Sequence, residues 1–97
     1  MALMQITMIP MGEGVSVGSY VADIQKRLQE EGVTFTLTDM ATLIEGDAQS
    51  LLALLGRIYE TPFTNGAVRV VTNITIDDRR DKSVRIGDKI DAVQKRL

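Results

Sequence analysis

Three stretches of the chain alternate with the two-residue period of a β-strand. Residues 3–9 place Met4, Ile6 and Met8 on one face, residues 33–38 alternate large apolar side chains with threonines, and residues 67–77 alternate in the same way. Because successive side chains of a strand point to opposite faces, each stretch predicts a strand with one buried face. Residues 42–45, between a predicted turn at 39–41 and a glycine, add a short fourth strand.

Two further stretches repeat their apolar residues at helical spacing. Ser16 is predicted to be the N-cap of the first helix and Gly32 its C-cap. Asp47 is predicted to cap the second helix, which the proline of residues 61–62 disturbs because a residue before proline avoids the helical region. The Asn-Gly pair at 65–66 is a stop signal that ends this segment.

A last amphipathic helix follows the fourth strand. Ser83 is predicted to cap it, and its apolar positions are Ile86, Ile90, Val93 and Leu97. The element order is strand, helix, strand, strand, helix, strand and this terminal helix. That order predicts an α+β protein of one domain, residues 1–97, with a ferredoxin-like βαββαβ sandwich. Four antiparallel strands would carry two helices on one face, and the C-terminal helix would be an addition.

The two faces of the predicted sheet differ in character. The helix-covered face is predicted to supply the core with Met4, Ile6, Met8, Val33, Phe35, Leu37, Val68, Val70 and Ile74. The opposite face would show Gln5, Thr7, Ile9, Thr34, Thr36, Thr38, Thr42, Val71, Asn73 and Thr75. This second face is almost uncharged, which suits contact with another protein surface or with a neutral-to-cationic small molecule. The alternative is that threonine is simply a good strand former.

Composition and charge exclude several classes of function. The chain has 97 residues, a formal net charge of −2, no cysteine and no histidine. An acidic balance does not favour nucleic-acid binding, and disulfides, thiol catalysis, histidine triads and Cys/His zinc sites are excluded. The N-terminus lacks a basic segment, and no run reaches the roughly 20 apolar residues that span a bilayer. We therefore expect a cytoplasmic protein with no membrane partner.

A dense run of charges, residues 77–82, follows the fourth strand. Its three aspartates alternate with two arginines and a lysine, which would neutralise them pairwise. Convergent carboxylates for a metal ion or an acid–base pair are therefore not predicted, and no catalytic residue is assigned. The run is better explained as ion pairs that tie the strand end to the last helix or to a neighbouring subunit.

Three blocks of this sequence resemble the thiamine-binding protein family, whose members are related to the YkoF thiamine-binding protein. They are "ITMIPMGEGVSVGSYVADIQKRL" (residues 6–28), "TLTDMATLIEG" (36–46) and "RVVTNITIDDRRDK" (69–82). The resemblance covers nearly the whole chain. It implies a ferredoxin-like fold, a homotetramer assembled through the sheets, and binding of thiamine or its hydroxymethylpyrimidine part without catalysis and without a cofactor. Asp39 and Ala41 stand where the family usually has proline and glycine.

The resemblance also implies a set of site residues. Glu45, Thr38, Thr42 and Asn73 would read the edge of an aminopyrimidine ring, and Met8, Met40 or Phe35 would lie against its plane. Ser16 would hold a hydroxyl or a phosphate through the backbone N–H groups of a helix start, or it would be a plain cap. Glu45 has the alternative of simply ending a strand, and Thr38 and Thr42 have that of filling a sheet interface.

Two other functions are compatible with the predicted fold. One is a regulatory or scaffold module that forms oligomers without a small ligand. The other is a small acylphosphatase-like hydrolase, which would need an arginine in the loop after the first strand. The sequence there, "PMGEGVS", has none.

Overall fold

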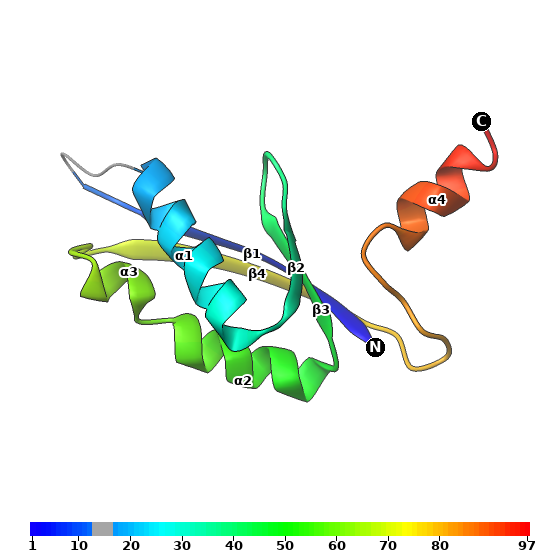
Figure 1. Ribbon diagram of the computed structural model, residues 1–97, viewed down its shortest axis with the longest axis horizontal. Coiled ribbons are helices and arrows are strands. Elements are labelled where there is room, and N and C mark those ends of the chain that lie inside the picture. The colour runs from blue at the N-terminus through cyan, green and yellow to red at the C-terminus, as the bar shows by residue number, and fades with distance from the viewer. Residues whose placement is uncertain (13–16) are drawn as a thin grey trace.

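The computed structural model describes residues 1–12 and 17–97, so the predicted cap Ser16 lies outside the described residues. The chain forms a four-stranded antiparallel sheet in the order β2-β3-β1-β4, with helices on one face (Figure 1). The elements are β1 (Ala2–Pro10), α1 (Val17–Glu31), β2 (Thr34–Leu37), β3 (Thr42–Gly46), α2 (Ala48–Ile58), α3 (Thr61–Thr64), β4 (Val70–Asp78) and α4 (Asp88–Gln94). This is the ferredoxin-like α+β arrangement that the sequence predicts, with a C-terminal helix.

β1 is the central strand of the sheet and sets the register of its neighbours. It pairs antiparallel with β3 and with β4, so that Ile6 lies opposite both Thr42 and Ile74. β2 forms the outer edge and pairs with β3 alone. Residues directly opposite in an antiparallel pair share a face, so the register assigns every strand residue to the helix face or the open face.

The helix face of the sheet holds the hydrophobic core. Both α1 and α2 pack on β1 and across each other, and α2 also packs on β3. The predicted core residues of β1 are confirmed, since Met4 is 0% and Ile6 2% exposed. Ile44 of β3 is fully buried too, although the sequence analysis did not place it in the core. The buried cluster comprises Ala2, Met4, Ile6, Met8, Ile24, Leu28, Ile44, Leu51, Leu54 and Ile58.

Three predicted core residues are exposed, and Val33, Phe35 and Val70 are partly buried. Leu37 is 52%, Ile74 40% and Val68 88% exposed. Leu37 and Ile74 lie on the helix face, opposite Thr42 and Ile6, but they belong to the two edge strands, β2 and β4. α1 and α2 pack mainly on β1 and β3, so the two edge strands keep exposed apolar side chains. Val68 precedes β4, which begins only at Val70, because the backbone N–H of Ala67 donates instead to the carbonyl of Pro62 (3.0 Å).

Thr42 is the clearest correction to the predicted sheet faces. It was expected on the open face, but it is 5% exposed on the helix face, opposite Ile6 and Leu37. Gln25 of α1 satisfies it there, donating from Nε2 to Thr42 Oγ1 at 3.0 Å. β3 begins at Thr42 as predicted, so the error lay in the face assigned to the strand, which its pairing with β1 and β2 sets.

The second helical segment breaks where its proline predicts. α2 ends at Ile58, and Pro62 sits in the first turn of the short helix α3, where its missing N–H costs nothing. Asp47 is the N-cap of α2 as predicted, since its side chain accepts from Ser50 N at 3.1 Å. Gly66, at φ +106°, follows α3 in a conformation that side chains disfavour.

The last helix begins later than predicted, and Ser83 is not its cap. α4 starts at Asp88 after Gly87, which has φ +97°. The backbone N–H of Ile86 donates a hydrogen bond to Oε2 of the Glu45 side chain at 2.9 Å. This bond and the buried Val84 hold the connecting segment to the sheet, whereas α4 itself stands away from it (Figure 1).

We expect Ile44→Ala to destabilise the chain by about 2–5 kcal/mol, because a fully buried β3 side chain would leave a cavity under the helices. Leu52→Ala on α2 is the control, since Leu52 is 49% exposed and its loss should cost under about 1 kcal/mol. Urea unfolding measures both. Equal losses for the two variants would contradict the assigned core.

We expect Glu45→Ala to release the segment that leads to α4. The amide hydrogen of Ile86 loses a charged acceptor, so its exchange with solvent should accelerate about tenfold or more. Glu45→Gln keeps an acceptor oxygen and should accelerate exchange less. Hydrogen exchange followed by NMR measures the rates, and unchanged protection of Ile86 in Glu45→Ala would argue against the anchor.

Candidate functional site

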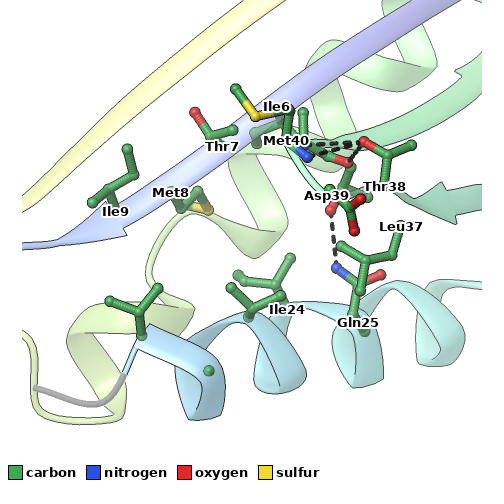
Figure 2. Close-up of a pocket in the computed structure, with 15 residues that line it drawn as sticks. Ile6, Thr7, Met8, Ile9, Ile24, Gln25, Leu37, Thr38, Asp39 and Met40 are labelled. Atoms are coloured by element: carbon green, nitrogen blue, oxygen red, sulfur yellow. Dashed lines mark hydrogen bonds between the residues drawn. The ribbon is translucent and has the colours of Figure 1, made fainter.

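A cavity of about 410 Å³ opens between the start of α1, the second half of β1 and the turn that joins β2 to β3 (Figure 2). This volume lies within the range of roughly 300–1,000 Å³ that small-molecule sites occupy. The cavity is open to solvent at the surface. Its lining is mostly apolar and comprises Ile6, Thr7, Met8, Ile9, Val17, Gly18, Val21, Ile24, Gln25, Leu37, Thr38, Asp39, Met40, Ala41 and Thr42.

The turn on one side of the cavity is held by Thr38. Its hydroxyl Oγ1 donates to the carbonyl of Ala41 at 2.7 Å and accepts from the backbone N–H of Ala41 at 3.1 Å. The backbone N–H of Thr38 also donates to Ala41 O at 2.9 Å. These bonds close the turn over Asp39 and Met40, so both residues are presented at the cavity from a fixed backbone (Figure 2).

The other side of the cavity is lined by Gln25, whose side chain has an unpaired oxygen. Gln25 of α1 uses its Nε2 to donate to Thr42, but its Oε1 is buried and has no hydrogen-bond partner among the described residues. A buried acceptor without a donor costs about 1–3 kcal/mol. A ligand that brings an N–H or O–H group to Gln25 would recover that cost. Sequence reasoning missed Gln25, because a glutamine on an amphipathic helix is ordinary.

Exposed apolar side chains form the rim of the cavity. Met40 is 86%, Leu37 52% and Val17 51% exposed. Among the lining residues within 1–12 and 17–97, Asp39 is the single charged side chain, and no lysine or arginine contributes. The cavity therefore suits a flat, largely apolar ligand with a donor group and without excess negative charge.

The structure brings half of the predicted site residues together. Thr38, Met40 and Thr42 all line the cavity, as does Met8, one of the predicted ring contacts. Glu45 and Asn73 lie on the open sheet face, Glu45 opposite Leu3 and Asn73 opposite Thr7. Their binding roles stay predictions for a ligand seated on that face. The remaining predicted residue, Ser16, is not among those described.

The open sheet face keeps much of the neutral character that the sequence predicts, but it also carries two carboxylates. The register places there Gln5, Thr7, Ile9, Thr34, Thr36, Val71, Asn73 and Thr75, together with Leu3, Leu43, Glu45 and Asp77. Thr38 lies in the turn beyond β2 rather than on this face. Ile9 and Val71, which lie opposite each other, are 40% and 39% exposed. In the part of the chain that the structure describes, no helix covers these residues (Figure 1).

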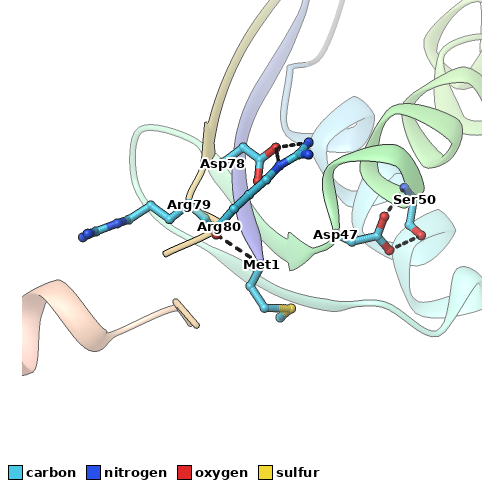
Figure 3. Close-up of polar contacts among 6 residues, drawn as sticks. All are labelled: Met1, Asp47, Ser50, Asp78, Arg79 and Arg80. Atoms are coloured by element: carbon cyan, nitrogen blue, oxygen red, sulfur yellow. Dashed lines mark hydrogen bonds and ion pairs between the residues drawn. The ribbon is translucent and has the colours of Figure 1, made fainter. Parts of the chain in front are cut away.

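The charge run that follows β4 forms ion pairs, as the sequence analysis proposed. Arg80 Nη2 lies 3.0 Å from Asp78 Oδ2, and Arg79 Nε donates to Asp81 Oδ1 at 3.0 Å. Figure 3 shows Arg80 folded back onto Asp78, while the backbone carbonyl of Arg79 accepts from Met1 N at 3.4 Å. Lys89 of α4 reaches Asp77 at 3.0 Å, which links the strand end to the last helix.

The Arg79–Asp81 pair favours the ionised state of Asp81. The hydrogen bond from Arg79 lowers the pKa of Asp81, and the same bond raises the pKa of Arg79. Asp81 therefore contributes stability above its ordinary pKa, and this contribution is lost as the pH falls through the lowered value. Each carboxylate is thus occupied by a neighbouring cation, which makes this cluster architectural.

No helix in the described part of the chain is long and apolar enough to cross a membrane.

Comparisons with known proteins agree with this architecture. The UPF0045 protein YqgV of Bacillus subtilis is 50% identical over 102 residues, covering 100% of this chain and 98% of that protein. A crystal structure from Methanocaldococcus jannaschii superposes with a TM-score of 0.83 at 29% identity, covering 97% of this chain and 96% of the other. A crystal structure from Thermotoga maritima shares the fold, with a TM-score of 0.79 at 15% identity, covering 95% of this chain and 97% of the other. That protein is provisionally described as acting in thiamine biosynthesis or salvage.

The model of the family described as "Thiamine-binding protein" matches residues 4–94, which includes β2, β3, β4, all but the first two residues of β1, and every described residue of the cavity. This chain belongs to the thiamine-binding protein family.

Proposed function

We propose that this protein binds thiamine or its hydroxymethylpyrimidine part without catalysis, and that the cavity beside α1 is the site. Membership of the thiamine-binding family supports the ligand class, and the description of the Thermotoga maritima protein points the same way. The observation that carries the proposal is Gln25, which lines an apolar cavity of about 410 Å³ and whose buried Oε1 is unpaired among the described residues.

The chemistry of an aminopyrimidine fits the groups at this cavity. Its exocyclic amine is a donor that would pair with Gln25 Oε1, and its ring is a flat apolar surface. Met8 and Met40 offer thioether side chains that adapt to such a ring and contact aromatic systems favourably. Thr42 would act by fixing the Gln25 amide, and Thr38 by fixing the turn that carries Met40.

We also propose that the protein works as a homo-oligomer, with a homotetramer as the predicted form. α4 runs over only Asp88–Gln94, and its residues Ile90 and Val93 are 62% and 56% exposed. A helix this short is marginal by itself, because isolated helices below roughly 12–15 residues are barely stable in water. A second copy that covers this stripe and the neutral open sheet face would supply the missing contacts.

For the ligand site, we expect Gln25→Leu to weaken binding of thiamine and of hydroxymethylpyrimidine by about five- to tenfold, since each loses one hydrogen bond in the cavity. Gln25→Glu keeps an acceptor at the same position and should weaken binding less. Isothermal titration calorimetry measures the dissociation constants.

The matched control is Gln29→Leu, which makes the same replacement one turn later on α1 at an exposed position. It should leave both affinities unchanged within about twofold. If the unmodified protein shows no heat with either ligand at millimolar concentration, the proposed function is wrong. If Gln25→Leu and Gln29→Leu behave alike, binding occurs elsewhere.

For the assembly, we expect the double variant Ile90→Glu, Val93→Glu to dissociate into smaller species, because two buried acids in an interface would lack partners. Light scattering after size-exclusion chromatography measures the mass. Leu52→Glu on α2 is the control, since Leu52 is 49% exposed but lies on another surface, and its mass should not change. A monomeric unmodified protein at micromolar concentration would refute the proposed oligomer.

A further inference from the structure

Charge at the cavity is one-sided. Within the described residues, the lining contributes one carboxylate, that of Asp39, and no basic side chain. A phosphorylated ligand normally meets arginine, lysine or a metal ion, because its charge must be compensated as it leaves water.

We propose that Asp39 selects the charge of the ligand, so that the cavity takes a cationic, unphosphorylated thiazolium compound and disfavours its phosphate esters. This inference rests on the proposed function, since it concerns the same cavity. The thiazolium ring of thiamine carries a permanent positive charge, whereas hydroxymethylpyrimidine carries none. A carboxylate at the cavity therefore distinguishes the two ligands by charge.

The backbone places Asp39 to act in this way. It lines the cavity from the turn between β2 and β3, next to Thr38, whose hydroxyl closes that turn with bonds of 2.7 and 3.1 Å to Ala41 (Figure 2). Asp39 is exposed to solvent, so its interaction with a cation is that of a water-screened charge pair. Such a pair changes a dissociation constant a fewfold and weakens with salt.

The start of α1 is the feature that could favour an anion. Val17 and Gly18 line the cavity, and a helix N-terminus carries roughly half a positive charge. A phosphate ester brings about 1.5 to 2 negative charges at neutral pH, which this partial charge does not balance in the presence of Asp39. The net preference is therefore for the unphosphorylated compound.

Calorimetric titration with three compounds tests the inference: thiamine, hydroxymethylpyrimidine and thiamine monophosphate. For the unmodified protein we expect thiamine to bind about tenfold or more tightly than thiamine monophosphate. Asp39→Asn should weaken thiamine binding about three- to fivefold and leave hydroxymethylpyrimidine within about twofold, because only thiamine carries the cation. Asparagine is well tolerated in turns, so the fold should be retained.

Glu60→Gln is the matched control. It removes the same unit of charge at an exposed position between α2 and α3 that does not line the cavity, and it should leave all three affinities unchanged. Raising the salt concentration should shrink the difference between the unmodified protein and Asp39→Asn.

Two results would overturn the inference while leaving the proposed function intact. One is thiamine monophosphate that binds as tightly as thiamine or more tightly. The other is a loss of thiamine affinity in Asp39→Asn that is no larger than the loss in Glu60→Gln. Absence of binding by all three compounds would instead remove the proposed function, and the charge preference with it.

Discussion

The reach of two helices across a four-stranded sheet is the constraint on which the rest of this structure depends. α1 and α2 pack on β1, with α2 also on β3, and bury the β1 row of Met4, Ile6 and Met8. The edges receive less cover, so Leu37 stays 52% exposed although it faces the same way as that row. The cavity lies at the same margin, where the start of α1 and the turn after β2 are both at the border of the core.

Local periodicity was sufficient to predict the fold. The alternation in β1 and the helical repeats of α1 and α2 show which side of each element is apolar. The order of strands and helices along the chain is then compatible with few topologies of the sheet. Thr42 was placed on the wrong face because its side depends on how the turn sets the register of β3. Even so, Thr42 and Glu45 are three positions apart in a strand, an odd number, so they could not have faced one ligand together.

The site itself was less predictable, because it consists of space between elements. Gln25 lies one position after the buried Ile24 on α1. Its Nε2 donates to Thr42 on the neighbouring strand, whereas its Oε1 has no partner among the described residues, and neither fact can be read from the sequence. The start of α4 depended on a distant contact in the same way. Ser83 is a good cap by residue type, but the bond from Ile86 N to Glu45 keeps that segment out of a helix until Gly87.

The density of charged residues along the chain does not locate the site. Polar groups that lack a partner within the described residues are the better indication. Asp77, Asp78 and Asp81 each contact a cation of this chain, so they have little left to offer a ligand. The open face is also partly committed, because Glu45 is engaged by the segment that leads to α4. Among the described residues, the buried side-chain atoms without a hydrogen-bond partner on the helix side are the amide oxygen of Gln25, which lines the cavity, and the hydroxyl of Thr72 opposite Met8. The open side offers a largely neutral surface and, beside it, the exposed helix α4. The proposed ligand site therefore lies mainly on the helix side of the sheet and the proposed assembly surface mainly on the open side, and the two meet at Thr7 and Ile9 of β1.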